Sequence, residues 1–169
     1  DKNGNYELLT ISDIEDGKIN NNLLKINDNK NKYDRYLLKN GDIVISARGT
    51  KIKIAVAEIK NRKIIPNGNL LVIRLNTEKI NPYYLQAYLN SENGQLSLEQ
   101  IQTGAIIMSI NPSRIEQIKV SIVDKNVQDE FAEKYKNKLT ELKQAQEHVQ
   151  ELKYKINNIF TNEIEEKII

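Results

Sequence analysis

The chain changes character near Asn126, and this change limits the folds that the sequence can adopt. From Val127 to the C-terminus the sequence contains neither Gly nor Pro. Apolar residues recur there every three or four positions, a spacing that places them along one face of an α-helix. This apolar stripe comprises Tyr135, Leu139, Leu142, Ala145, Val149, Leu152, Ile156 and Ile159. The pattern predicts one long helix over residues 126–169, with Asn126 as its N-cap, after a compact domain over residues 1–125.

A single long helix cannot bury such a stripe against one small domain, so we expect it to pair with a second long helix. Large aliphatic side chains contribute about 1.5–3 kcal/mol each on burial, so six of them give roughly 10 kcal/mol gross. The candidate oligomerisation residues are Leu139, Leu142, Val149, Leu152, Ile156 and Ile159. The partner helix belongs either to another subunit or to a different part of the same parent chain.

Residues 1–125 are predicted to form an α+β domain with a curved, mainly antiparallel sheet and short helices. Runs rich in β-branched and aromatic residues predict strands, and Asn-Gly turns at 40–41 and 67–68 separate them. Asn-Pro pairs at 81–82 and 111–112 predict helix starts, because Asn caps a helix and Pro is tolerated in its first turn. The expected strands are 6–11, 23–26, 43–47, 52–59, 70–75 and 119–123, and the expected helices begin near residues 82, 94 and 112.

Composition excludes several classes of function for this chain of 169 residues. It has no cysteine, so it has no disulfide, thiolate metal site or cysteine nucleophile. The single histidine, His148, lies one position off the apolar stripe and allows neither a histidine metal cluster nor a histidine-centred triad. No stretch approaches the ~20 apolar residues of a membrane span, and no signal-peptide pattern is present. We expect a cytoplasmic protein without metal or other cofactor, and the abundance of Asn, Lys and Ile favours a bacterial source.

Basic residues are concentrated between residues 25 and 63, although the net charge of the chain is only +2. They are Lys25, Lys30, Lys32, Arg35, Lys39, Arg48, Lys51, Lys53, Lys60, Arg62 and Lys63, against four acidic residues in the same stretch. Lysine and arginine neutralise phosphates, while Arg, Asn and Gln form bidentate pairs with guanine or adenine edges. The pattern favours nucleic-acid binding, and an ordinary solvated charged face is the alternative.

Two catalytic patterns are weighed against this interpretation. Asp42, followed by a strand and then Glu58-Ile59-Lys60, matches the Asp…Glu-x-Lys arrangement in which two carboxylates of a nuclease hold Mg²⁺. Asn81-Pro82-Tyr83-Tyr84 is similar to the Asn-Pro-Pro-Tyr of adenine methyltransferases, but it lacks the second Pro and no Gly-rich loop accompanies it. The second pattern is therefore interpreted as a helix cap. A coiled-coil adaptor that binds only proteins is a further alternative.

Short segments between residues 38 and 131 follow one another in an informative order and spacing. They are 38–45, 48–50, 69–75, 81–91 with Gly94, 103–105, 109–112, 115–118, 120–123 and 127–131. The series resembles the target-recognition half of type I restriction–modification specificity subunits, and similar domains fused to the C-terminus of DNA adenine methyltransferases. The long helix stands in the expected place after it.

The resemblance implies a non-catalytic domain that reads one half of a DNA target, held by its helix at a fixed distance from another such domain or from a methyltransferase. The family usually carries Pro-Leu-Pro before the helix, where this chain has Ser121-Ile122-Val123-Asp124. It often carries Gln after Gly104-Ala105, where Ile106-Ile107-Met108 follow here. One recognition domain instead of two implies either a half-size protein that dimerises or a fused domain.

Both the composition and the resemblance lead to a set of expected DNA contacts. Lys51, Lys53, Arg62 and Lys63 are expected to contact phosphates, and Arg48, Thr50, Asn67, Asn69, Gln102 and Thr103 are expected to contact bases. Ser109 is a further expected DNA contact, which with Gln102 and Thr103 takes the place of the Gln that this loop lacks. The expected partners are double-stranded DNA, a DNA adenine methyltransferase subunit or domain, and a second copy or equivalent half that pairs through the helix. No catalytic or metal-binding residue is expected.

Overall fold

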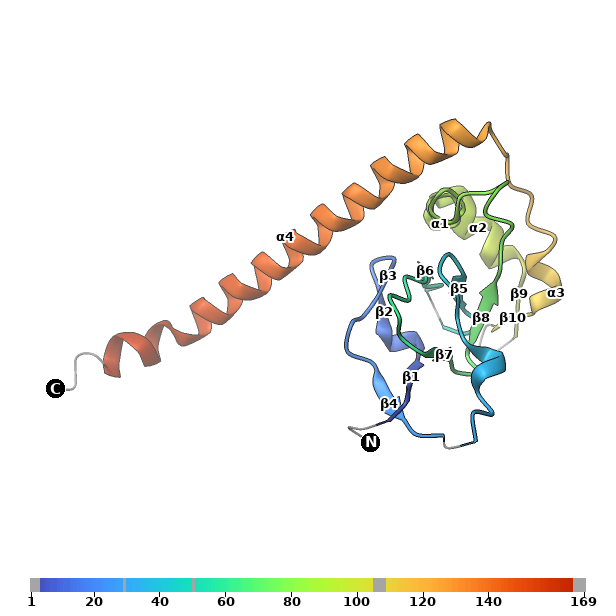
Figure 1. Ribbon diagram of the computed structural model, residues 1–169. Helices are drawn as coiled ribbons and strands as arrows, with labels where there is room; N and C mark the ends of the chain where they lie inside the picture. The colour runs from blue at the N-terminus through green and yellow to red at the C-terminus, as the bar shows by residue number, and fades with distance from the viewer. Residues whose placement is uncertain (1–3, 29, 50, 105–108, 166–169) are drawn as a thin grey trace.

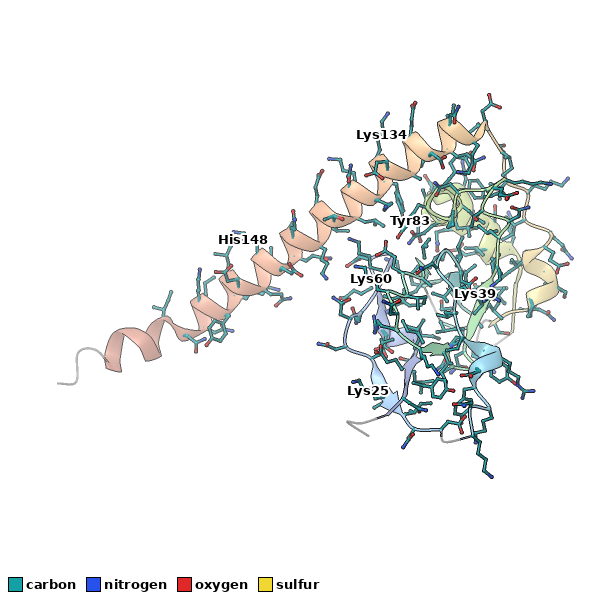
Figure 2. All side chains as sticks on the ribbon, in the orientation of Figure 1. Lys25, Lys39, Lys60, Tyr83, Lys134 and His148 are labelled. Atoms are coloured by element: carbon teal, nitrogen blue, oxygen red, sulfur yellow. The ribbon has the colours of Figure 1, made fainter. Side chains whose placement is uncertain are left out.

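The computed structural model describes residues 4–28, 30–49, 51–104 and 109–165, with side chains as far as residue 159. We call residues 4–124 the head; the long helix α4, on which Lys134 and His148 lie, leaves it as a rod (Figure 1, Figure 2). The strands are β1 (Tyr6–Leu9), β2 (Ile14–Glu15), β3 (Lys18–Ile19), β4 (Leu24–Ile26), β5 (Ile43–Ser46), β6 (Ile54–Val56), β7 (Ile64–Pro66), β8 (Leu70–Ile73), β9 (Gln102–Thr103) and β10 (Ser109–Ile110). The helices are α1 (Pro82–Asn90), α2 (Glu92–Gln100), α3 (Pro112–Ile115) and α4 (Lys125–Glu165), with 3₁₀ turns at Ile11–Asp13 and Asp34–Tyr36.

The strands form several small sheets. One has the order β6-β5-β8 with both pairs antiparallel, and a second has the order β4-β1-β7, in which β1 and β7 run parallel. The pairs β2–β3 and β9–β10 are antiparallel hairpins. The predicted α+β class with mainly antiparallel pairing is confirmed, although the single curved sheet is divided.

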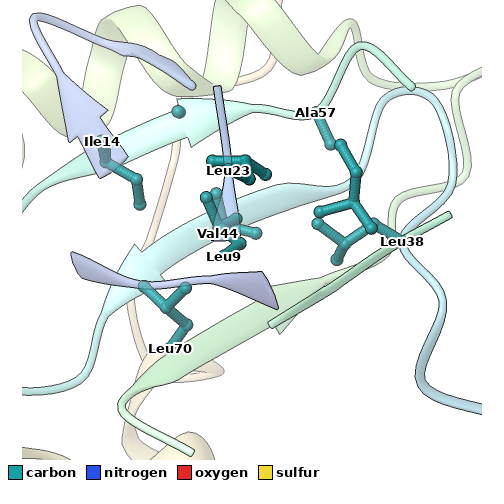
Figure 3. Packing of buried hydrophobic residues seen from close by; sticks show 9 residues of the cluster. Leu9, Ile14, Leu23, Leu38, Val44, Ala57 and Leu70 are labelled. Atoms are coloured by element: carbon teal, nitrogen blue, oxygen red, sulfur yellow. The ribbon is translucent and has the colours of Figure 1, made fainter. Parts of the chain in front are cut away.

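The strand predicted over residues 43–47 is central: β5 lies between β6 and β8 and is buried along its whole length. Val44 points into a core formed with Leu9 and Leu70 (Figure 3). Its neighbours in β5 face the other way, toward α1 and α2, where Ile43 and Ile45 belong to a second core cluster. Alternate side chains of a strand point to opposite faces, so covering both faces requires an apolar residue at every position.

Capping residues start α1 and α3 as predicted. The Asn81 side chain accepts a hydrogen bond from the N–H of Tyr83 (2.9 Å), and Asn111 accepts one from Ser113 (3.1 Å). The second helix begins at Glu92, two residues earlier than expected, because Ser91 caps it. Gly94 is required there, since a Cβ atom at this position would lie 2.0 Å from the carbonyl oxygen of Tyr88.

Several predicted boundaries are wrong. The first strand ends at Leu9 and a 3₁₀ turn begins at Ile11, and the strand predicted over 52–59 is paired only over Ile54–Val56. The strand predicted over 119–123 is absent, since these described residues join no ladder. Hydroxyl groups on α1 hold this segment instead, as Tyr84 donates to the carbonyl of Ser121 (2.7 Å) and Tyr88 to that of Lys119 (3.1 Å). Asn126 lies inside α4, which begins at Lys125.

The first part of α4 packs on the head. Gln128, 1% exposed, accepts from the N–H of Asn81 (2.9 Å) and donates to the carbonyls of Lys79 and Val123. Ala132 and Leu139 are also buried. Beyond them, α4 extends away from the head (Figure 1). Across the described ranges, no helix has both the length and the apolarity needed to cross a membrane.

The hairpin of β2 and β3 makes the last contacts between the head and α4. Lys18 Nζ donates to Thr140 Oγ1 (3.1 Å), and Gln146 Nε2 donates to the carboxylate of Asp16 (2.6 Å). A cleft of about 370 Å³ lies between this hairpin, the loop after β6 and α4, and Leu139 is among its lining residues. Leu139 thus contributes to the junction with the head, so the proposed pairing face retains the other five residues.

Candidate nucleic-acid interface

The C-terminal end of β5 joins three segments that are far apart in the sequence. The N–H of Ala47 donates to the carbonyl of Asn69 (2.8 Å), and the carbonyl of Ala47 accepts from the N–H of Ile110 (2.9 Å). The next residue, Arg48, forms an antiparallel bridge with Ser109. The backbone therefore brings the β5–β6 loop, the β7–β8 turn and the β9–β10 hairpin to one end of the central sheet.

These three segments carry most of the predicted base-contacting residues. Ser109 pairs with Thr103 in the hairpin, and its hydroxyl donates to the carbonyl of Thr103 (3.3 Å). In the turn, the side-chain oxygen of Asn67 accepts from the N–H of Asn69 (3.1 Å), which fixes the turn. We call this surface the rim; it comprises Arg48, Lys51, Asn67, Asn69, Gln102, Thr103 and Ser109.

Several polar side chains of the rim are available to bind a ligand. Arg48, Lys51 and Thr103 are exposed, and the remaining rim residues are half-buried. Within the part of the chain that the structure describes, the guanidinium of Arg48 and the side-chain amides of Asn69 and Gln102 have no hydrogen-bond partner. Arginine and amide side chains of this kind are those that form bidentate pairs with guanine and adenine.

Two predicted contact residues have different surroundings. Thr50 lies outside the described residues. Lys53 is half-buried beside the rim, and its Nζ donates to the carbonyl of Ile11 (3.3 Å), so part of its donor capacity is already used.

The structure separates Arg62 and Lys63 from the rim. Both precede β7, whereas the rim turn follows it, so they lie at opposite ends of this strand. Arg62 forms an ion pair with Glu7, with Nε at 2.7 Å from the carboxylate, and it also donates to the carbonyl of Asn21 (2.9 Å). Its charge is therefore neutralised internally, which the sequence could not reveal because Glu7 is far away along the chain.

The residues of the nuclease alternative are engaged elsewhere. Asp42 is 2% exposed and accepts hydrogen bonds from Arg74 Nε (2.8 Å) and Nη2 (2.6 Å) and from the N–H of Lys39 (2.7 Å). Glu58 accepts a hydrogen bond from the hydroxyl of Tyr83; burial, together with this bond, raises the pKa of Tyr83. Over the described residues, no group of three or more His, Asp or Glu side chains is placed to hold a metal ion. The geometry does not favour the nuclease.

Comparison with known proteins identifies the class of this domain. A family model described as the type I restriction modification DNA specificity domain matches residues 1–166. A putative type I restriction enzyme specificity subunit, MjaX, of Methanocaldococcus jannaschii is 30% identical over 133 residues. This alignment covers 75% of the present chain and 31% of the relative, so the chain spans about a third of that protein. The chain belongs to the type I restriction modification DNA specificity domain family.

Proposed function

We propose that this protein recognises a double-stranded DNA sequence for a restriction–modification system, reading one half-site with the rim and performing no catalysis of its own. The observation that carries the proposal is the meeting of three segments at the end of β5, where Arg48, Asn69 and Gln102 have side chains available for base edges. Family membership supports the same function.

In this proposal α4 positions the rim relative to a second recognition domain and a DNA adenine methyltransferase. Five apolar stripe residues support a pairing face, because they remain exposed along α4: Leu142 (43%), Val149 (47%), Leu152 (44%), Ile156 (65%) and Ile159 (52%). Such a row on one helix is typical of a surface that pairs with another long helix. The second helix would come from another copy of this chain or from an equivalent half of a larger subunit.

Replacing Arg48 with alanine tests base reading. The preferred sequence is first selected from a random duplex pool with the parent protein. Loss of a bidentate arginine–guanine pair costs about 1–3 kcal/mol of discrimination, so R48A should lose roughly 5-fold to 150-fold of the preference for the selected over a scrambled duplex. Lys134→Ala removes one charge from the exposed surface of α4 and serves as the control. An R48A protein with the parent's preference in anisotropy titrations would refute the assignment.

A further inference from the structure

A second cationic surface lies at the end of β7 opposite the rim. Four cations gather there, three of them held over tyrosine rings. Lys32 Nζ lies 5.1 Å from the ring centroid of Tyr33, the guanidinium of Arg35 lies 4.7 Å from that of Tyr36, and Lys63 Nζ lies 5.2 Å from that of Tyr6. The fourth, Lys30, is exposed. We call Lys30, Lys32, Arg35 and Lys63, with these three tyrosines, the cation–ring surface.

Buried polar contacts hold the backbone beneath this surface. Asp28 is 6% exposed, and its carboxylate accepts from the N–H of Lys30 (3.1 Å) and of Tyr33 (3.3 Å). The side chain of Asn5 bonds both the N–H and the carbonyl of Asp28, at 2.9 and 3.0 Å. Tyr6 and Tyr33 meet edge to face with ring centroids 5.8 Å apart. The segment is therefore held in place by the head.

The rings hold the cations in place without cancelling their charge. A tyrosine ring is neutral, so a cation above it is positioned while its charge and its N–H donors stay available. Arg62 differs, because a carboxylate both holds and neutralises it. Asp34 pairs with Lys63 only at 3.8 Å with both side chains half exposed, a geometry worth at most about 1 kcal/mol. The hydroxyl of Tyr6 also donates to Asp34.

We infer that the cation–ring surface grips phosphates of duplex DNA outside the bases that the rim reads. Arg35, with its guanidinium 4.7 Å from the Tyr36 ring centroid, keeps its charge and a planar set of N–H donors, which is the group that binds a phosphate through two hydrogen bonds. From Lys63 to Asn67 the chain advances four residues, or about 13 Å at ~3.3 Å per residue, which corresponds to about four base pairs along a strand. The inference rests on the proposed function and adds a sequence-independent contact to it.

The test uses the full chain with Lys30, Lys32 and Arg35 replaced by serine. All three side chains are exposed, so the fold should persist, which circular dichroism checks. The probes are a hairpin-closed duplex in which the sequence selected by the parent has at most two flanking base pairs on each side, and the same sequence with flanks to about three turns. A control with Lys134, Lys138 and Lys153 replaced by serine loses the same charge from exposed positions on α4.

On the long duplex, the triple variant should bind about 10-fold or more weakly, and the slope of log K against log salt should fall by about 2–3. Its affinity for the short duplex and its preference for the selected over a scrambled sequence should equal those of the parent. A second variant keeps the serines at positions 30 and 32 but carries Arg35→Lys. Its salt slope should be about one unit steeper than that of the triple variant, while its affinity should stay below that of a protein with Arg35, because lysine keeps the charge but not the planar donors.

The outcomes separate this inference from the proposed function. If the triple variant matches the control in salt slope and affinity on the long duplex, the cation–ring surface does not bind phosphates, while an effect of R48A on sequence preference would leave the rim assignment intact. If the triple variant loses sequence preference while R48A keeps it, the cation–ring surface reads bases, and both assignments are wrong. If the parent binds no duplex at low salt, the proposed function fails.

Discussion

Two alanine substitutions in the apolar stripe distinguish residues that stabilise the junction between α4 and the head from residues that pair α4 with a second helix. Leu139 is 9% exposed and contacts the β2–β3 hairpin, where a Cβ atom at Gly17 would lie 3.4 Å from its Cδ2. Leu152 is 44% exposed on the free part of α4. We expect Leu139→Ala to destabilise the single chain, whereas Leu152→Ala should weaken only its association with a second helix.

The expected magnitude follows from burial. Truncation of a buried leucine costs about 2–5 kcal/mol. The low end, about 2 kcal/mol, applies to Leu139 because it lines a cleft in which water can replace part of the lost side chain. For a chain of this size that corresponds to a fall of about 4–8 °C in the unfolding temperature. Leu152→Ala should change the stability of the single chain by less than about 0.5 kcal/mol.

Thermal unfolding followed by circular dichroism over a wide range of protein concentrations measures both effects. The unfolding temperature of an associating protein rises with concentration, so Leu152→Ala should flatten this dependence and Leu139→Ala should lower the whole curve. Sedimentation analysis of the same samples reports the oligomeric state directly. Leu139→Ala could instead flatten the concentration dependence of the unfolding temperature and leave the unfolding temperature of the most dilute sample unchanged. Leu139 would then belong to the pairing face, and the argument from burial would fail.

Two further substitutions test polar contacts. Asp42→Asn should lower the free energy of unfolding by about 1–3 kcal/mol, measured by urea titration. This loss is smaller than for a fully buried ion pair, because half of the Arg74 side chain stays in water. An unchanged urea midpoint would contradict a stabilising ion pair between Asp42 and Arg74. Hydrogen bonds from Asn81 and Lys125 hold the pKa of Asp129 below its ordinary value of 3.8, so its stabilising contribution is present at neutral pH and is lost as the pH falls through this lowered pKa. Asp129→Asn should therefore lose less stability than the parent between about pH 5 and about pH 3, and equal losses would argue against this linkage.

Local signals in the sequence predicted the helices and the central strand. Asn81-Pro82 and Asn111-Pro112 start helices because their caps bond the next turn, a contact within two residues. Pairings between distant segments left no such signal. The parallel contact of β1 with β7 and the ion pair of Arg62 with Glu7 join residues more than fifty positions apart. Residues 119–123 have a strand-like composition, yet tyrosine hydroxyls from α1 bond two of the carbonyls that a ladder would use.

The same limit applies to the candidate site. The sequence identified rim residues by type, because arginine and amides beside turns suit base recognition. It could not show that backbone bonds of Ala47 unite three segments, nor that β7 separates Lys63 from Asn67. The basic stretch therefore looked like one surface, whereas the structure divides it: β7 separates Lys63 from the rim, and Lys60 lines the cleft beside α4.

The attachment of α4 to the head sets the direction of the helix relative to the rim. Contacts with the head continue as far as Gln146, and the turn at Gly17 allows them: its φ is +79°, and a Cβ there would lie 2.9 Å from Nε2 of the buried Gln86. From Gln146 to Glu165 the helix advances 19 residues, about 29 Å at 1.5 Å per residue, in one fixed direction. A flexible linker of 19 residues would span a similar root-mean-square distance, about 25 Å, in every direction. What the helix adds is direction, and a fixed direction is what two rims need if they are to meet half-sites at a defined spacing.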